Sequence, residues 1–156
     1  MENKTNLTVL HCVFYIYHTF AFTSDGKLTQ EEKNTISNFM YRWVGKDQEK
    51  MTQIINETLS WSRINIKNIN DQIGAMISMV EFLKTQKDFS IERREYFLMD
   101  IRNIARSDNK FLDQQKKWHD MLASILGLNI RISQATSKDI NGAVKKVEKR
   151  KIGFRR

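Results

Sequence analysis

The stretch Ser24-Asp25-Gly26-Lys27-Leu28 recurs in this chain as Ser107-Asp108-Asn109-Lys110-Phe111. Each copy follows an apolar run with helical spacing and precedes another such run. Self-similarity at a fixed separation indicates one structural unit used more than once. The repeat therefore predicts a helix–acidic loop–helix unit that occurs twice.

The similarity continues outside the two quoted stretches. Phe14 lies ten residues before the first copy, and Phe97 lies ten residues before the second. Glu32 lies seven residues after the first aspartate, and Gln115 lies seven residues after the second. The second copy thus lacks both the glycine and the downstream carboxylate of the first.

The composition favours helices over strands. The 156 residues include no proline and only six glycines, while 40% are apolar and 28% are charged. Few turn residues and a large apolar fraction are typical of helices joined by short polar loops around one core. We expect an all-α fold, a single bundle of six to seven helices with a pseudo-two-fold repeat of helix–acidic loop–helix.

Apolar spacing and helix-end signals define the expected helices. A helix that is apolar on most sides, here the first, belongs in the middle of a bundle. We expect residues 1–128 to form the helical domain and residues 129–156 to form a basic segment that is partly helical or flexible. The predicted helices cover residues 5–22, 29–45, 47–62, 66–86, 90–105 and 112–126, with a weaker one after Ser137.

The cellular compartment is predicted from the cysteine count and the first apolar run. Cys12 has no partner for an internal disulfide, which favours a reducing environment. The run 7–22 is shorter than a membrane span and contains His11 and His18, so we interpret it as a buried helix. We expect a cytoplasmic protein.

The first acidic turn supports two interpretations. Thr29 and Glu32 have the spacing of a capping box, in which each side chain binds the other residue's backbone amide. Alternatively, Asp25 and Glu32 supply hard oxygen ligands, which suit Ca²⁺, Mg²⁺ or Mn²⁺ better than zinc. The sequence leaves both open.

The run 24–32 after a long apolar helix resembles the tellurite-resistance TerB-like family, which shows an Asp-Gly-x-aliphatic-Ser/Thr-x-x-Glu signature. The family also has a late degenerate copy and a last helix that ends near Leu-Gly-Leu, like residues 126–128 here. Similar domains form the N-terminal part of a membrane-anchored J-domain co-chaperone. The resemblance covers about residues 5–128.

The resemblance implies a non-enzymatic helical module of bacterial stress-response systems, with a protein partner and a divalent-metal site between the two loops. Asp25, Glu32 and Asp108 match the family's acidic positions. Gln115 departs from them, so we expect the second loop to bind weakly or only to assist.

Other chemistry has little support. His11 and His18 share a helix face beside Cys12, but no further zinc-ligand spacing accompanies them, and we expect partly buried, hydrogen-bonded histidines. His119 is expected on a solvated helix face. The chain also lacks phosphate-loop, nucleophile-elbow and metalloprotease motifs, so we expect no enzyme.

The net charge of +8 is concentrated at the C-terminus, since residues 138–156 carry a net +6. Such a tail suits an alternative function, binding to nucleic acid or an anionic membrane. A solubilising extension is the simpler interpretation. The basic residues of the alternative are Lys145, Lys146, Lys149, Arg150, Lys151, Arg155 and Arg156.

Overall fold

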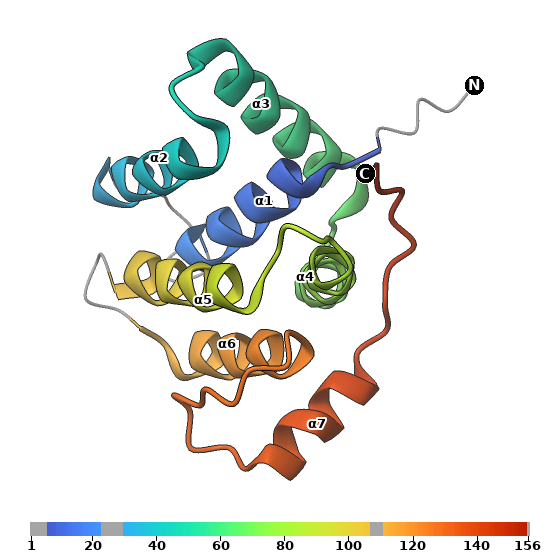
Figure 1. The fold of residues 1–156 in the computed structure, drawn as a ribbon. Coiled ribbons are helices and arrows are strands. Elements are labelled where there is room, and N and C mark those ends of the chain that lie inside the picture. The colour runs from blue at the N-terminus through green and yellow to red at the C-terminus, as the bar shows by residue number, and fades with distance from the viewer. Residues whose placement is uncertain (1–5, 23–29, 107–110, 156) are drawn as a thin grey trace.

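The computed structural model describes residues 6–22, 30–106 and 111–155, and within them it is all-helical (Figure 1). In this part of the chain the only β-type pairing is an isolated parallel bridge between Leu7 and Phe154. The seven helices are α1 (Val9–Phe22), α2 (Gln30–Val44), α3 (Gln48–Asn65), α4 (Ile69–Lys84), α5 (Ile91–Arg106), α6 (Asp113–Ile125) and α7 (Ser137–Lys146).

Local chemistry explains where several helices begin and end. Asp47 and Asn68 accept hydrogen bonds from backbone amides in the first turns of α3 and α4. Gly45 and Gly127 have φ values of 84° and 76°, the left-handed conformation that favours glycine after a helix. After α6, the amide of Leu128 donates to the carbonyl of Ala123 across this glycine. These ends were predicted from the sequence to within a few residues.

Two predicted helix starts are too early. The first helix begins at Val9 rather than at residue 5, because Leu7 pairs with the C-terminal segment instead. The amide of Leu7 donates to the carbonyl of Gly153 over 2.8 Å, and the amide of Arg155 donates to the carbonyl of Leu7 over 2.8 Å. The fourth helix begins at Ile69 rather than at residue 66, since Asn68 is its N-cap.

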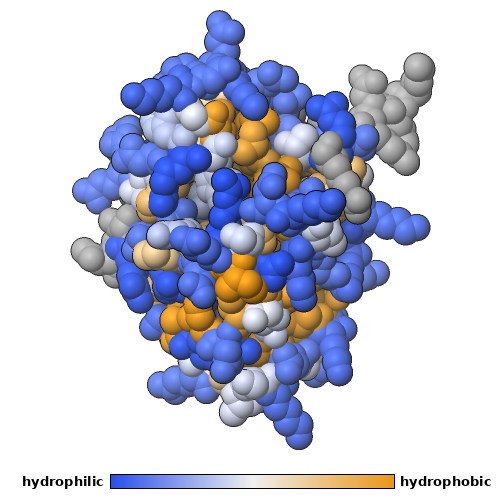
Figure 2. Space-filling model, in the orientation of Figure 1, coloured by the Kyte–Doolittle hydropathy of each residue, from blue (hydrophilic) through white to orange (hydrophobic). Residues whose placement is uncertain are grey.

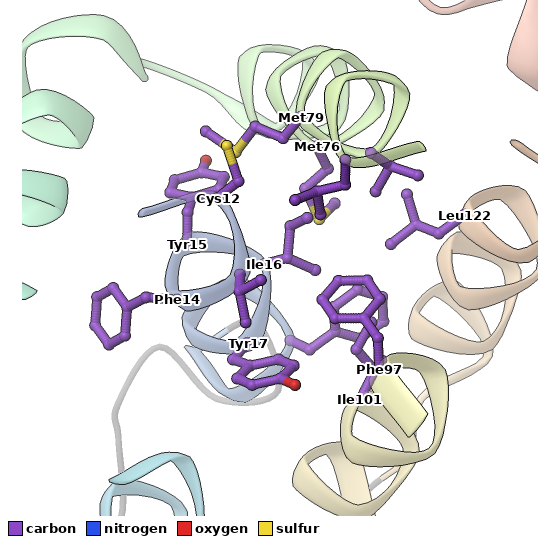
Figure 3. Close-up of a cluster of buried hydrophobic side chains, with 14 of the residues drawn as sticks. Cys12, Phe14, Tyr15, Ile16, Tyr17, Met76, Met79, Phe97, Ile101 and Leu122 are labelled. Atoms are coloured by element: carbon purple, nitrogen blue, oxygen red, sulfur yellow. The ribbon is translucent and has the colours of Figure 1, made fainter. Parts of the chain in front are cut away.

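Helix α1 occupies the middle of the bundle, as its apolar faces predicted. It packs against α2, α3, α4 and α5, and Figure 1 shows α2 and α3 on one side of it and α5 on the other. The close-up of the core shows Ile16 of α1 facing Met76 of α4, and Tyr17 facing Phe97 of α5 (Figure 3). One apolar core therefore joins segments from the whole chain.

The C-terminal part packs on this bundle. Helix α7 lies against α6, and the segment that follows runs back past α4 toward the N-terminal end of α1 (Figure 1). The ring of Phe154 stacks on Phe82 of α4 with 4.3 Å between centroids. A β-carbon at Gly74 would come within 2.5 Å of the carbonyl oxygen of Glu148, so only glycine allows this close approach.

The outer surface is mostly polar. Figure 2 shows hydrophilic side chains over most of one face, interrupted by apolar groups. Among the described residues, no helix combines the length and the apolar character needed to cross a bilayer.

Candidate functional site

Of the predicted metal ligands, Glu32 is the one that the structure describes; Asp25 and Asp108 lie outside the described residues. Glu32 lies in the first turn of α2, and its side chain is 1% exposed. A carboxylate is stabilised at this end of a helix by the free backbone amides and the positive end of the helix dipole. A buried carboxylate thus lies directly after the first acidic turn.

Gln115, at the matching position of the second copy, is equally buried in the first turn of α6. Its side-chain oxygen accepts a hydrogen bond from the amide of Leu112 over 3.0 Å. Its side-chain nitrogen donates to the carbonyl of Phe20 over 2.7 Å. The amide thus caps its own helix and ties α6 to the last turn of α1.

This contact brings together the flanks of the two acidic turns. Phe20 lies just before the first turn, and Gln115 lies just after the second. The rings of Phe20 and Trp118 also meet edge to face, with 6.3 Å between centroids. The end of α1 and the start of α6 are therefore packed against each other.

A second polar group links α1, α2 and α5. The hydroxyl of Tyr17 donates to Asp100 over 2.7 Å, and Arg42 donates to the other carboxylate oxygen over 2.5 Å. The indole of Trp43 donates to the same hydroxyl over 3.0 Å. Burial raises the pKa of Asp100, although the bonds from Tyr17 and Arg42 oppose it. Burial, and next the charge of Asp100, raise the pKa of Tyr17 well above its usual value.

The sequence analysis missed this group, although a signal for it exists. Tyr17 and Asp100 are 83 residues apart, which is also the separation of Ser24 and Ser107 in the two copies. The two partners therefore occupy equivalent positions of the repeat.

A pocket opens beside this group, between α2 and α5. Its volume is about 350 Å³. The guanidinium of Arg93 lies 5.4 Å from the ring centre of Trp43, and that of Arg42 lies 4.8 Å from the ring centre of Phe39. The pocket is lined by Arg42, Trp43, Arg93, Tyr96 and Asp100.

The prediction that His119 is solvated is wrong. The side chain is fully buried, because α5 and the segment after α6 cover this part of α6. Its Nε2 lies 2.9 Å from Arg102, which can only donate, and its Nδ1 lies 3.0 Å from Asp120. These partners favour the neutral ring with the proton on Nδ1. Burial lowers the pKa of His119, although Asp120 opposes this shift.

Asp120 fastens the segment that follows α6. Its carboxylate accepts hydrogen bonds from the amides of Ile132 and Ser133, both over 2.9 Å, and from the Ser133 hydroxyl over 2.5 Å. Burial alone raises the pKa of Asp120, but these bonds and that from His119 lower it below its usual value. Asp120 and His119 therefore have a structural role, because they hold α6 to the segment that follows it and to α5.

The two histidines of α1 have separate environments. Nδ1 of His11 accepts a hydrogen bond from the amide of Thr8 over 3.0 Å, and its Nε2 lies 3.2 Å from Glu57. The ring of His18 lies 5.7 Å from that of Phe14, and burial lowers its pKa. Within the described ranges, no three His, Cys, Asp or Glu side chains gather as metal ligands would.

The basic tail residues divide into paired and exposed ones. Arg150 pairs with Asp71, and Lys149 lies 3.0 Å from Glu81, so both cations contact carboxylates of α4. Arg156 lies outside the described residues. The remaining predicted residues are exposed at the surface, namely Lys145, Lys146, Lys151 and Arg155.

A larger groove, about 790 Å³ in volume, lies between α6 and α7. Lysines line both walls, and two aspartates partly balance them. The charged residues that line it are Asp113, Lys116, Lys117, Lys138, Asp139 and Lys146.

Comparisons with known proteins add nothing to the TerB-like resemblance, which rests on the sequence motifs alone. No protein-family model, curated protein or solved structure matches the chain.

Proposed function

We propose that this protein is a non-enzymatic helical interaction module of the TerB-like, stress-response type, and that its duplicated acidic turn binds a divalent cation. The observation that carries the proposal is the hydrogen bond between Gln115 and Phe20, which joins the flanks of the two turns. The ligands are Asp25, Glu32 and Asp108.

Chain length permits these carboxylates to converge. Asp25 follows the last residue of α1 by three positions, and Asp108 precedes the first residue of α6 by five. Extended chain spans at most about 3.5 Å per residue, so the reach is about 11 Å in one case and about 18 Å in the other. The end of α1 and the start of α6 are packed against each other, so chain of this length allows Asp25 and Asp108 to reach the same cation.

The donor chemistry favours Ca²⁺, Mg²⁺ or Mn²⁺. Three carboxylates supply hard oxygens and three negative charges, and such cations bind more tightly as ligand charge increases. Gln115 adds no charge, and its oxygen already binds the amide of Leu112. We therefore assign the strong ligands to the first copy together with Asp108.

The proposal includes an approximate two-fold relation between the hairpins α1–α2 and α5–α6. Residues 83 positions after α1 fall within α5, and Gln30, the first residue of α2, corresponds to Asp113, the first residue of α6. Equivalent residues of two related units touch only near their common axis. The bond between Tyr17 and Asp100 is such a contact, and it supports this relation.

Thermal unfolding with EDTA and with each cation tests the site. A ligand at 100 times its Kd stabilises the native state by about 2.7 kcal/mol, which raises Tm by about 5–10 °C in a chain of this size. We expect this shift for the wild type, and its loss in Asp25→Asn, Glu32→Gln and Asp108→Asn. Asp88→Asn, an exposed carboxylate outside the turns, should keep it.

The same experiment distinguishes a metal ligand from a helix cap. If Glu32 only caps α2, Glu32→Gln lowers Tm by the same amount with and without cation. If the chain has no cation site at all, no cation raises the Tm of the wild type either. That result would contradict the cation site.

The groove between α6 and α7 favours a second candidate function, binding of nucleic acid or an anionic membrane. Its lysines on both walls, rather than Lys149 and Arg150 with their carboxylate partners, then provide the charge. Titrations with single-stranded RNA and with phosphatidylserine vesicles at increasing salt test it. Affinity should decrease with salt and decrease further in Lys116→Ala/Lys138→Ala. Unchanged affinity in that variant would contradict this candidate.

A further inference from the structure

Glu32 is not among the described residues that line the pocket between α2 and α5, and each arginine of the pocket contacts a neighbouring side chain. Arg42 donates a 2.5 Å hydrogen bond to Asp100, which is itself buried. Arg93 lies over the ring of Trp43. Side chains that are ordered before binding lose little conformational entropy when a partner arrives.

Beside the pocket, α5 exposes large apolar side chains where the repeat predicts buried ones. Val13 and Ile16 of α1 are fully buried. The equivalent residues of α5, 83 positions later, are Tyr96 and Met99, which are 47% and 40% exposed. The same helix face is therefore covered in one copy and open in the other.

At Ile16, helix α4 accounts for this difference. It packs against α1 and α6, and its Met76 faces Ile16 in the core (Figure 3). The equivalent place in the other half is over α5 and α2. Apart from α1, none of the described helices packs extensively on both of these.

We infer that the α2–α5 surface, made of Arg42, Trp43, Arg93, Tyr96 and Met99, binds an amphipathic helix of a partner protein that carries carboxylates. The inference deepens the proposed interaction role and rests on the proposed two-fold relation. The occupant is a helix because α4 fills the equivalent place inside this chain. Tryptophan, tyrosine and arginine are also the residues that most often dominate binding energy at interfaces.

Charge favours an acidic partner. Two guanidinium groups and one carboxylate line the pocket, which gives it a net positive charge. Two exposed carboxylates of the same helix, Glu92 and Glu95, do not line it.

Fluorescence anisotropy with a labelled peptide tests this surface on the full-length protein. The probe has the sequence of Ile69–Lys84, the helix of the equivalent site, preceded by three glutamates; a second probe carries three lysines instead. We expect saturable binding of the acidic probe, at least about fivefold tighter than that of the lysine probe. Equal affinity for the two probes would overturn the acidic partner.

Variants of exposed residues locate the binding site. Tyr96→Ala/Met99→Ala should weaken binding by about tenfold or more, as expected for anchor residues. Ile91→Ala is the matched control, since Ile91 is exposed on α5 but does not line the pocket. Circular dichroism melts establish that each variant is folded. Equal affinity for the wild type and the double variant would overturn the inference.

Two further measurements test whether a second copy of the chain occupies the surface and whether peptide binding depends on the cation. Sedimentation velocity of the wild type tests for a second copy as occupant, and a dimer that Tyr96→Ala/Met99→Ala dissociates would overturn the partner helix. Probe binding is expected to continue in EDTA and in Asp25→Asn. The peptide site and the cation site therefore fail independently.

Discussion

The hairpins α1–α2 and α5–α6 differ in what covers them, although their sequences align without gaps around the acidic turns. In the first, α4 covers α1, and the face that contains Ile16 is fully buried. In the second, the equivalent face contains the exposed Met99. Helix α4 therefore helps to bury a face of α1 whose sequence counterpart on α5 is exposed.

The two copies also differ in charge at one buried position. Glu32 in α2 is a carboxylate, whereas Gln115 in α6 is an amide that binds the backbone of α1. The residues at these matching sequence positions therefore differ in chemistry, since Gln115 ties α6 to α1 and Glu32 has a buried carboxyl group.

The largest expected effect is a difference in stability between alanine variants of Ile16 and Met99, which occupy matching sequence positions. Ile16→Ala removes buried methyl groups beside α4 and should cost about 3 kcal/mol of unfolding free energy. Met99→Ala should cost about 0.5 kcal/mol or less, because the side chain is partly in solvent. Urea unfolding of both variants gives the two values.

Equal losses of unfolding free energy in Ile16→Ala and Met99→Ala would contradict this expectation. They would mean that α5 is covered in solution by something with the same effect as α4. A monomeric protein at low concentration provides the control, since self-association would make the loss depend on concentration.

A smaller effect is expected when the second copy is given the charge of the first. Gln115→Glu loses the donor to the Phe20 carbonyl and buries a carboxylate, so without cation it should destabilise the protein by about 2 kcal/mol. If the acidic turns bind a divalent cation, Ca²⁺, Mg²⁺ or Mn²⁺ should recover part of this loss. Melts with and without cation measure it.

Gln115→Met is the matched control, because it removes the same hydrogen bonds without adding charge. Its melting temperature should respond to cation no more than that of the wild type. Equal behaviour of the two variants would argue that Gln115 lies too far from any bound cation to matter.

The smallest expected effect is on the pH dependence of stability. It concerns His119 in α6 and the residue at the matching sequence position in α2, Ile36. Burial lowers the pKa of His119 below its ordinary 6.5, so the unfolded chain takes up a proton first as pH falls. Its contribution to stability is therefore lost below about pH 6.5. His119→Ile should flatten the decrease in stability between about pH 7 and pH 5.

Ile36→Val provides the control for this measurement, since it changes packing at the equivalent position without a titrating group. It should shift unfolding free energy equally at each pH. His18, whose pKa burial also lowers, contributes to the slope that remains in His119→Ile. An unchanged slope in His119→Ile would show that the ring does not titrate in this range.

Much of the fold was predictable because helix formation depends on near neighbours. Apolar residues at helical spacing predicted the central position of α1, and Gly45 and Gly127 predicted two helix ends. The candidate site was predictable only in part. The repeat predicted the equivalence of Glu32 and Gln115, but not that Gln115 binds the carbonyl of Phe20, a residue 95 positions away.

Sequence alone therefore determined the all-helical class and most of the inward apolar faces, because both follow from residue spacing and local backbone chemistry. Only the tertiary structure decided that His119 is buried, that Asp100 meets Tyr17, and that Phe154 stacks on Phe82 of α4. The physical reason is distance along the chain. Such contacts depend on which helices pack together, and the pattern of a single segment carries no information about its partner.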